Sequence, residues 1–322
     1  MGLDIWNPWH GCHKCSPGCD HCYMYFMDGK RDRSEWSGEV WRTSKMRQPL
    51  AKNRQKQFKM KAGQRIRVNM TSDTFLTEAK EWMPEFWSVI RQRPDLIFWL
   101  LTKRPQNIMN MLPSDWNDGY DNVQLNITTE NQDMFNYRWN IFKDIPAKHK
   151  GICCAPMLTA VNMEPALSSG QIEDISCGGE NYDGCRIIRY DWVKDLSEQC
   201  AKHHVNFIWH ESGTRPEKDG VVYFIPNKEM QAHLAYWAGL NQFFGKPEYK
   251  LYDPNDGHLL APEELYQRKF NKNRCVFCSS RMSCCGCLSC GDCKEPPDLV
   301  SLEEIWDEEL RQTQAMQNTA QQ

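Results

Sequence analysis

The middle of the chain alternates between short apolar segments and helix-length segments, and this alternation limits the fold more than any other feature. Six segments resemble buried strands: residues 66–70, 96–101, 123–128, 151–155, 172–177 and 205–209. Helix-length segments separate several of them: residues 81–93, 131–143 and 191–203. Strand–helix repetition is typical of parallel sheets. With a first strand ending at residues 9–12, the sequence predicts an α/β fold, a partial (β/α)6-type parallel barrel with six or seven β/α units.

Two of the helix-length segments carry start signals. Pro84 falls near the start of segment 81–93, where proline is tolerated because the first helical amides have no intrahelical acceptor. Asp191 is expected to cap segment 191–203 through its carboxylate.

Polar residues follow five of the predicted strands directly. In parallel barrels, ligands bind at the carboxyl ends of the strands and in the loops that follow them. The sequence therefore predicts one shared ligand pocket, with candidate residues in segments 69–73, 102–105, 126–131, 177–180 and 209–213.

Four cysteines lie within eleven residues near the N-terminus: Cys12, Cys15, Cys19 and Cys22. The last three have the spacing C-x-x-x-C-x-x-C, by which radical S-adenosylmethionine (SAM) enzymes hold a [4Fe-4S] cluster on three thiolates. Three protein ligands leave one iron open for SAM, whereas a ferredoxin cluster uses four cysteines. Four cysteines at this density can also close a tetrahedral zinc site. The third iron ligand is either Cys15 or Cys12.

Seven more cysteines lie between residues 275 and 293. Two ligand sets compete there. An unbroken C-x-x-C-x-x-C-x-x-C run resembles ferredoxin-type ligation, whereas two C-x-x-C pairs resemble a zinc ribbon. So short a segment with little apolar content needs a metal to fold. The sequence predicts a second metal centre, an auxiliary iron–sulfur cluster or zinc, with ligands from Cys275, Cys278, Cys284, Cys287, Cys290 and Cys293.

Composition bounds the remaining possibilities. Hydrophobic residues make up 40% of the 322 residues, and no apolar run reaches the roughly 18 residues of a membrane helix. The start carries no secretory signal pattern, so we expect reducing cytoplasm, no membrane, and metal ligands or free thiols rather than disulfides. Core packing is expected for Cys153, Cys154, Cys177, Cys185 and Cys200.

The domain division follows from these patterns. We expect a barrel over residues 1–223, a connector packed on it over 224–270, a cysteine-rich metal-binding segment over 271–297, and an acidic helix with a disordered tail over 298–322.

One stretch of the chain is strongly basic although the net charge is −3. Residues 42–67 contain ten Lys or Arg residues and no Asp or Glu. Such a stretch can follow a phosphate backbone or can be a solvated surface of the barrel. Phe58 is its only aromatic residue, which weakens the case for base stacking.

The motifs together resemble a phage-associated, radical-SAM-like family of uncharacterised function. The resemblance is carried by residues 6–12 and 16–23, with similar stretches at 69–73, 101–105, 178–180 and 191–193. It covers about residues 3–215, and more distantly the chain looks like spore photoproduct lyase, a radical SAM enzyme that repairs thymine dimers in DNA. The family's cysteines match Cys12, Cys19 and Cys22, with Cys15 often replaced. Relatives tend to carry an acidic residue where this chain has Ala155 before Pro156.

The resemblance implies a mechanism and a set of partners. A [4Fe-4S] cluster would hold SAM and pass it one electron, supplied by a donor such as flavodoxin or ferredoxin. The resulting radical would act on an unknown substrate, with a nucleotide or nucleic acid among the candidates. The expected cofactor-binding residues are Asn69, Ser72, Asp73, Asn126, Thr128, Glu130, Gly178, Gly179 and Glu180.

The catalytic candidates are the charged residues of the same rim. Lys103 and Arg104 suit a phosphate or carboxylate of the substrate, or form a structural ion pair with Asp73 or Glu130. His210 and Glu211 suit proton transfer, or are structural.

Three function classes therefore compete. The first is a radical SAM enzyme, the second a nucleic-acid-binding module with two zinc sites, and the third a non-catalytic iron–sulfur partner protein.

Overall fold

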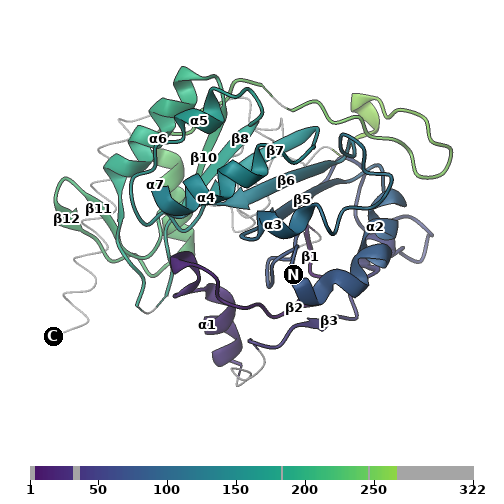
Figure 1. Cartoon of the computed structure of the whole chain (residues 1–322), viewed down its shortest axis with the longest axis horizontal. Helices are drawn as coiled ribbons and strands as arrows, with labels where there is room; N and C mark the ends of the chain where they lie inside the picture. Colours follow the sequence, from purple (N-terminus) through teal and green to yellow (C-terminus); the bar gives the residue numbers. More distant parts are fainter. Residues whose placement is uncertain (1–3, 32–36, 183, 246, 267–322) are drawn as a thin grey trace.

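A curled sheet of seven parallel strands forms the centre of the molecule (Figure 1). The computed structural model describes residues 4–31, 37–182, 184–245 and 247–266. Neighbouring strands pair in the order β1-β4-β5-β6-β7-β8-β10, and every pair is parallel. The strands are β1 (Ile5–Trp6), β4 (Arg65–Val68), β5 (Ile97–Thr102), β6 (Val123–Thr128), β7 (His149–Cys154), β8 (Asp174–Gly178) and β10 (Asn206–Glu211).

Contacts across the sheet show how strongly it curls. The guanidinium of Arg65 on β4 donates to the carboxylate of Asp174 on β8 at 2.9 Å. These strands are four positions apart in the sheet, about 19 Å if the sheet were flat. The two side chains meet only because the sheet closes around its inner face, so the expected parallel barrel is present as a seven-stranded half-barrel.

The inner face is polar at the amino ends of the strands. The amide of Gln124 on β6 donates to Asp174 at 3.0 Å, and the hydroxyl of Tyr249 donates to the Gln124 side chain at 3.2 Å. Burial raises the pKa of the Tyr249 phenol. Tyr249 belongs to the segment after β10, so this residue contacts the amino end of the half-barrel.

The sequence predicted six of these strands to within two residues at each end, and β6 with identical bounds. The prediction for the first strand was wrong. The sheet strand β1 ends at Trp6, because Pro8 has no amide hydrogen for the ladder. Residues Trp9–His10 instead form β2, which pairs antiparallel with β3 (Trp41–Arg42).

The helices follow the predicted segments closely. Their bounds are α1 (Tyr23–Gly29), α2 (Met83–Arg91), α3 (Pro105–Ile108), α4 (Gln132–Phe142), α5 (Glu164–Leu167), α6 (Tyr190–Lys202) and α7 (Lys228–Trp237). Pro84 lies in the first turn of α2, as expected. Asn131 caps α4 by accepting from the amide of Met134 at 2.9 Å. Asp191 does not cap α6: the N-cap is Arg189, no side-chain cap bond forms, and Asp191 lies within the first turn.

Three short strands form a separate small sheet in the order β12-β11-β9. β9 (Ile188–Arg189) and β11 (Pro216–Lys218) are parallel, whereas β12 (Val221–Val222) is antiparallel to β11. The 3-10 helices are η1 (Pro17–Cys19), η3 (Gln48–Leu50), η4 (Thr77–Trp82) and η5 (Pro262–Glu264).

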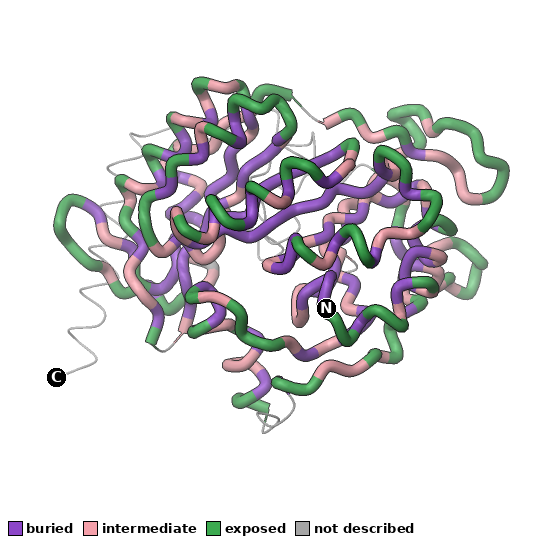
Figure 2. Tube along the Cα trace, in the orientation of Figure 1, coloured by how far each residue is buried: buried purple, intermediate pink, exposed green. Residues whose placement is uncertain are grey.

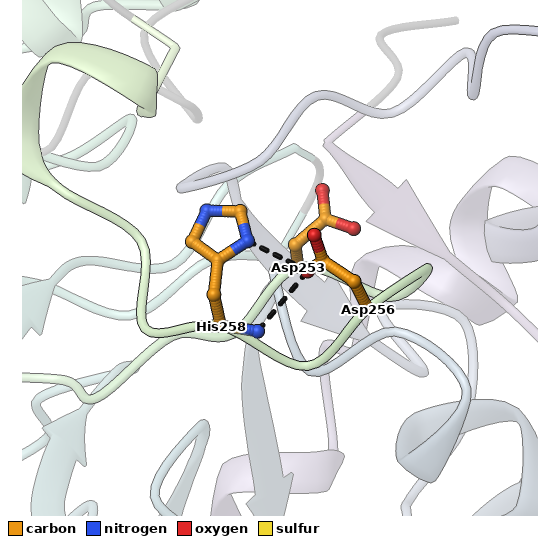
Figure 3. A group of neighbouring side chains, drawn as sticks. All are labelled: Asp253, Asp256 and His258. Atoms are coloured by element: carbon orange, nitrogen blue, oxygen red, sulfur yellow. Dashed lines mark hydrogen bonds and ion pairs between the residues drawn. The ribbon is translucent and has the colours of Figure 1, made fainter.

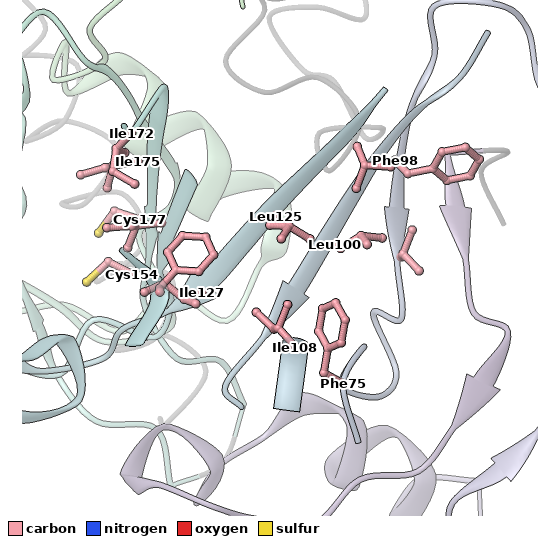
Figure 4. Close-up of a cluster of buried hydrophobic side chains, with 14 of the residues drawn as sticks. Phe75, Phe98, Leu100, Ile108, Leu125, Ile127, Cys154, Ile172, Ile175 and Cys177 are labelled. Atoms are coloured by element: carbon pink, nitrogen blue, oxygen red, sulfur yellow. The ribbon is translucent and has the colours of Figure 1, made fainter. Parts of the chain in front are cut away.

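The apolar core lies between the outer face of the sheet and the helices (Figures 2 and 4). Alternate strand residues such as Phe98, Leu100 and Leu125 are fully buried in it. The five cysteines expected in the core are buried, and the thiol of Cys177 contacts the sulfur of Met157 at 3.6 Å. No helix of the described residues is long and apolar enough to cross a membrane. The predicted C-terminal metal-binding segment and tail lie outside the described residues.

Candidate functional site

The five predicted polar segments meet on one rim of the half-barrel. Each follows the carboxyl end of a strand, and all these strands are parallel. A loop of residues 11–22, here called the cysteine loop, lies across this rim. The Ser72 hydroxyl after β4 donates to the carbonyl oxygen of Gly11 at 2.5 Å, and the amide of Gly11 donates to the carbonyl oxygen of Thr71 at 3.2 Å.

The cysteine loop carries four thiols that differ in burial. η1 forms a tight turn that ends at Cys19, and α1 begins directly after Cys22. Cys19 is buried, Cys12 and Cys22 are half-buried, and Cys15 is exposed. The Cys15 thiol hydrogen bonds to Cys19, and the charges of Cys19 and Cys22 act on Cys12. These interactions make the thiols neighbours on the loop, but no three of their sulfur atoms lie within 4.8 Å of one another in the described residues.

The first support of the loop comes from the end of β5. Arg104 forms an ion pair with Asp73 at 3.0 Å, and its guanidinium also donates to the carbonyl oxygen of His13 at 2.5 Å. The same guanidinium lies 3.8 Å from the sulfur of Cys12. Asp73 additionally accepts from the hydroxyl of Thr102 at 2.5 Å and from the amide of Lys103 at 2.8 Å. The structural ion pair left open by the sequence is present, and it holds the loop.

The second support comes from the segment after β6. The Glu130 carboxylate accepts from Arg138 of α4 at 2.6 Å and from the amide of Gly18 at 3.2 Å. Both side chains of the ion pair are buried, with exposed fractions of 0% for Glu130 and 2% for Arg138. Burial alone raises the pKa of the Glu130 carboxyl, but Arg138 and Lys103 outweigh it, so the pKa is lowered. Both carboxylate oxygens thus have protein partners.

The third support comes from the segment after β8. The guanidinium of Arg186 donates to the Glu180 carboxylate at 3.0 Å and to the carbonyl oxygen of Pro17 at 2.6 Å. It also forms an ion pair with Asp20 at 3.2 Å. Glu180, expected to bind a cofactor, is buried and holds Arg186 against the cysteine loop.

Charged residues of both signs on the rim act on the thiols. Burial lowers the pKa of the Lys103 ammonium, but the negative charges of Cys19 and Glu130 outweigh this and raise it. The hydrogen bond from Cys15 and the charge of Lys103 lower the pKa of the Cys19 thiol to about 5, against the effect of burial. Burial, followed by the charge of Asp73, raises the pKa of the Cys12 thiol to about 12. Lys103 and Arg104 therefore act on the thiols directly.

Three expected cofactor-binding residues carry buried polar atoms without a hydrogen-bond partner in the described residues. They are both side-chain amide atoms of Asn69, Oδ1 of Asn126 and Oγ1 of Thr128. Each side chain is at most 2% exposed. Buried polar atoms are normally paired, because an unmade hydrogen bond costs about 1–3 kcal/mol. These atoms are suited to a polar ligand on this rim.

The last two strand ends have partners of their own. A Cβ at Gly178 would lie 2.6 Å from the His210 ring, and one at Gly179 would lie 2.7 Å from the carbonyl oxygen of Ser212, so packing between β8 and β10 explains both glycines. The Glu211 carboxylate accepts from Asn181 at 2.8 Å and from Lys228 at 2.6 Å. Burial alone raises the pKa of the Glu211 carboxyl, but the positive charges of Lys228 and His210 outweigh burial, so this pKa is lowered. Burial lowers the pKa of the His210 ring.

Two arginines of this site were missed from the sequence. Arg138 had a signal, because it lies on the apolar face of α4 between the buried Phe135 and Phe142. A charged residue at such a position indicates a buried partner. No sequence pattern marks Arg186 as a site residue, because it lies in an irregular segment and its partners at residues 17 and 20 are distant in the sequence.

A separate group of possible metal ligands lies far along the chain. The ligand atoms of Asp253, Asp256 and His258 are all within 4.8 Å of one another (Figure 3). Asp256 and His258 are exposed, and the His258 ring hydrogen bonds to Asp256 at 2.6 Å and to Glu264 at 3.0 Å. These mutual bonds account for the group as a surface turn.

The fold and rim define a class of protein: a parallel half-barrel that carries a four-cysteine loop across the carboxyl ends of its strands. Within this class, the chain belongs to the family described as Protein of unknown function (DUF5131), which it matches over residues 3–281. The match continues past the half-barrel and includes Cys275 and Cys278. No curated protein and no solved structure matches the chain.

Proposed function

We propose that this protein is a radical SAM enzyme, whose cysteine loop holds a [4Fe-4S] cluster on the rim of the half-barrel. The observation that carries the proposal is the position of this loop. Three supports from the ends of β5, β6 and β8 hold it over the rim where parallel barrels bind their ligands. The same strand ends carry buried polar atoms that have no hydrogen-bond partner in the described residues.

The donor set fits an iron–sulfur cluster with an open iron. We assign Cys12, Cys19 and Cys22 as the three ligands, because they are the more buried thiols, whereas Cys15 is exposed. The half-buried Cys12 packs against the apolar core, and its carbonyl oxygen accepts from the Tyr25 hydroxyl. Cys15 remains a neighbour of Cys19 without a ligand role.

The unpartnered polar atoms at the strand ends suit the amino-acid and ribose groups of SAM. The Asn69 amide offers both a donor and an acceptor, Thr128 offers a hydroxyl, and Asn126 offers an acceptor oxygen. The carboxylates of Asp73, Glu130 and Glu180 have structural partners, so we assign them to holding the rim rather than to direct SAM contacts.

When bound, the cluster supplies one electron to SAM and so makes homolytic cleavage of its sulfonium possible. The chain's own residues position and shield the reactants. Arg104 and Lys103 place positive charge beside the thiolates, which stabilises the negative charge of the ligand set. His210 is held beside Gly178 at the end of the same rim and is available to a substrate.

The test is anaerobic reconstitution followed by reduction. Iron and sulfide are counted, the visible absorption is recorded before and after dithionite, and 5′-deoxyadenosine is measured after SAM is added. We expect about four irons at the cysteine loop and dithionite-dependent 5′-deoxyadenosine. Colourless protein that holds zinc would contradict the proposal, as would an iron–sulfur protein that leaves SAM intact.

Single cysteine variants assign the ligands. Cys19→Ala and Cys12→Ala should lose the N-terminal cluster, whereas Cys15→Ala should keep it. Cys185→Ala is the matched control, because this thiol is also buried but lies outside the cysteine loop. Full iron content in Cys12→Ala together with its loss in Cys15→Ala would move the third ligand to Cys15.

A further inference from the structure

A cavity of about 660 Å³ lies beside the cysteine loop and has no role in the proposed chemistry. Its walls come from three separate parts of the chain. α1 and the residue after it contribute Phe26 and Lys30, the β8–β9 connection contributes Tyr182, and the segment after β10 contributes Arg215, Tyr223 and Phe224. The cavity therefore lies where α1 meets the small sheet of β9, β11 and β12.

Four aromatic residues line the cavity: Phe26, Tyr182, Tyr223 and Phe224. The rings of Phe26 and Tyr182 stack with their centroids 4.1 Å apart and an interplanar angle of 8°. Tyr182 has a φ of +71°, which a bulky residue rarely adopts. The backbone is therefore strained at the residue that carries this ring. Phe224 is 50% exposed at the cavity, and the neighbouring Val222 and Val221 of β12 are also exposed. A strip of apolar surface thus continues from the cavity along β12.

The described residues of the lining carry positive charge only. Lys30 and Arg215 line the cavity, and its described lining contains no Asp or Glu. Neither cation forms an ion pair with a carboxylate in the described parts of the chain. The protein as a whole has a net charge of −3, so this positive surface is a local feature. Lys30 lies over the Phe26 ring, 5.1 Å from its centroid. Aromatic rings beside cations that have no carboxylate partner suit an anionic ligand with flat apolar faces.

The cavity shares a wall with the cysteine loop. Gly184, which lines the cavity, lies against the ring of His21, since a Cβ at this glycine would be 2.9 Å from that ring. Phe26 is on the helix that begins directly after Cys22. A ligand in the cavity therefore lies next to the loop.

We propose that this cavity binds a segment of single-stranded nucleic acid. Bases stack on Phe224 and Tyr223, and phosphates lie at Lys30 and Arg215, as in proteins that bind single strands by aromatic stacking in a positive groove. The apolar strip along β12 extends the surface beyond the cavity, which suits a strand rather than a free nucleotide. Strand binding itself is independent of the proposed function, whereas its role as substrate rests on that function.

The test is fluorescence anisotropy with full-length protein and a labelled oligothymidylate of about ten nucleotides at low salt. Stacking of a base is worth about 1–3 kcal/mol, so Phe224→Ala should weaken binding by about 5- to 150-fold. Arg215→Gln should lower the slope of log K against log salt by about 0.7, the value for one phosphate contact of a single strand.

Two matched variants serve as controls. Tyr137→Ala removes an aromatic ring of similar exposure from α4, and Lys52→Gln removes a cation from the basic stretch of residues 42–67. Both should bind the oligonucleotide as the unmodified protein does. Unchanged melting temperatures for all four variants show that the fold is intact.

Three results would overturn the proposal. The first is that Phe224→Ala and Arg215→Gln bind the oligonucleotide as tightly as the unmodified protein. The second is that Lys52→Gln loses as much affinity for the oligonucleotide as Arg215→Gln does. The third is that thymidine monophosphate competes at the same concentration as the oligonucleotide. The cavity and the cysteine loop are tested separately. If the oligonucleotide binds as expected but reduced protein leaves SAM intact, the nucleic-acid site stands and the radical function fails. If SAM is cleaved but no strand binds, the reverse holds.

Discussion

The substitution Glu130→Gln tests whether the buried ion pair after β6 supports the cysteine loop. Glutamine keeps the shape of the side chain and one acceptor oxygen but removes the charge. Arg138, which is 2% exposed, then loses its charged partner at 2.6 Å. Removing one partner of a buried ion pair costs about 3–5 kcal/mol. Because the glutamine oxygen can still accept one hydrogen bond, we expect the free energy of unfolding to fall by about 3 kcal/mol at neutral pH.

The matched control is Glu85→Gln. Glu85 pairs with Arg42 at the same distance of 2.6 Å, but these side chains are 38% and 43% exposed. An exposed pair contributes about 0–1 kcal/mol, so the control should lose less than about 1 kcal/mol. The assay is urea unfolding with two probes, in which the midpoint should shift at constant slope.

The pH dependence provides a second readout. The pKa of Glu130 is lowered in the folded state from its ordinary value of 4.5. Its stabilisation is therefore complete well above pH 4.5 and is lost as the pH falls through the folded pKa. The difference between the original protein and Glu130→Gln should be constant from pH 8 to about 6 and should shrink in acid. Equal losses for both glutamine variants, or a difference that grows in acid, would refute this reasoning.

Three further substitutions test other contacts of the rim. Gly11→Ala should displace the cysteine loop from the rim, because φ at this residue is +87° and a Cβ would lie 1.6 Å from the carbonyl oxygen of Glu39. Circular dichroism measures the fold of this variant, and iron content measures its loop. Arg104→Gln should keep the fold but lower the iron retained on gel filtration, since it breaks the contacts to Asp73 and His13. Thr128→Val should raise the free energy of unfolding by about 1 kcal/mol, since it removes an unpartnered hydroxyl, and should weaken SAM binding measured by calorimetry.

The half-barrel could be predicted from the sequence because its strands are apolar and its helices are amphipathic. These local patterns predicted both ends of β6 correctly. The error at β1 arose because Trp9 and His10 are equally suited to a strand, and only the pairing with β3 shows that they leave the main sheet. Asp191 was an equally plausible cap, but α6 begins one residue before it.

The rim was predictable in place but not in detail. Strand ends of a parallel sheet share an edge, so the positions of Asn69, Lys103 and Glu130 followed from the fold class. The contacts of their side chains depend on tertiary structure, which joins Arg186 to Pro17 across 169 residues. The iron–sulfur chemistry, the electron donor and the ligands at Cys275–Cys293 remain predictions, and the last lie outside the described residues.

The supports of the cysteine loop also bear on how a metal centre is assembled. Zinc fingers use metal binding to fold, because their ligands are scattered in the empty chain. Here hydrogen bonds from Arg104 and Arg186, and one to Glu130, hold the backbone of the cysteine loop, and none of them involves a metal. We therefore expect apoprotein that is already folded, that takes up the proposed cluster rapidly, and that converts nearly all the binding energy into affinity. Until it is loaded, the same proximity leaves Cys15 and Cys19 prone to oxidative cross-linking in air.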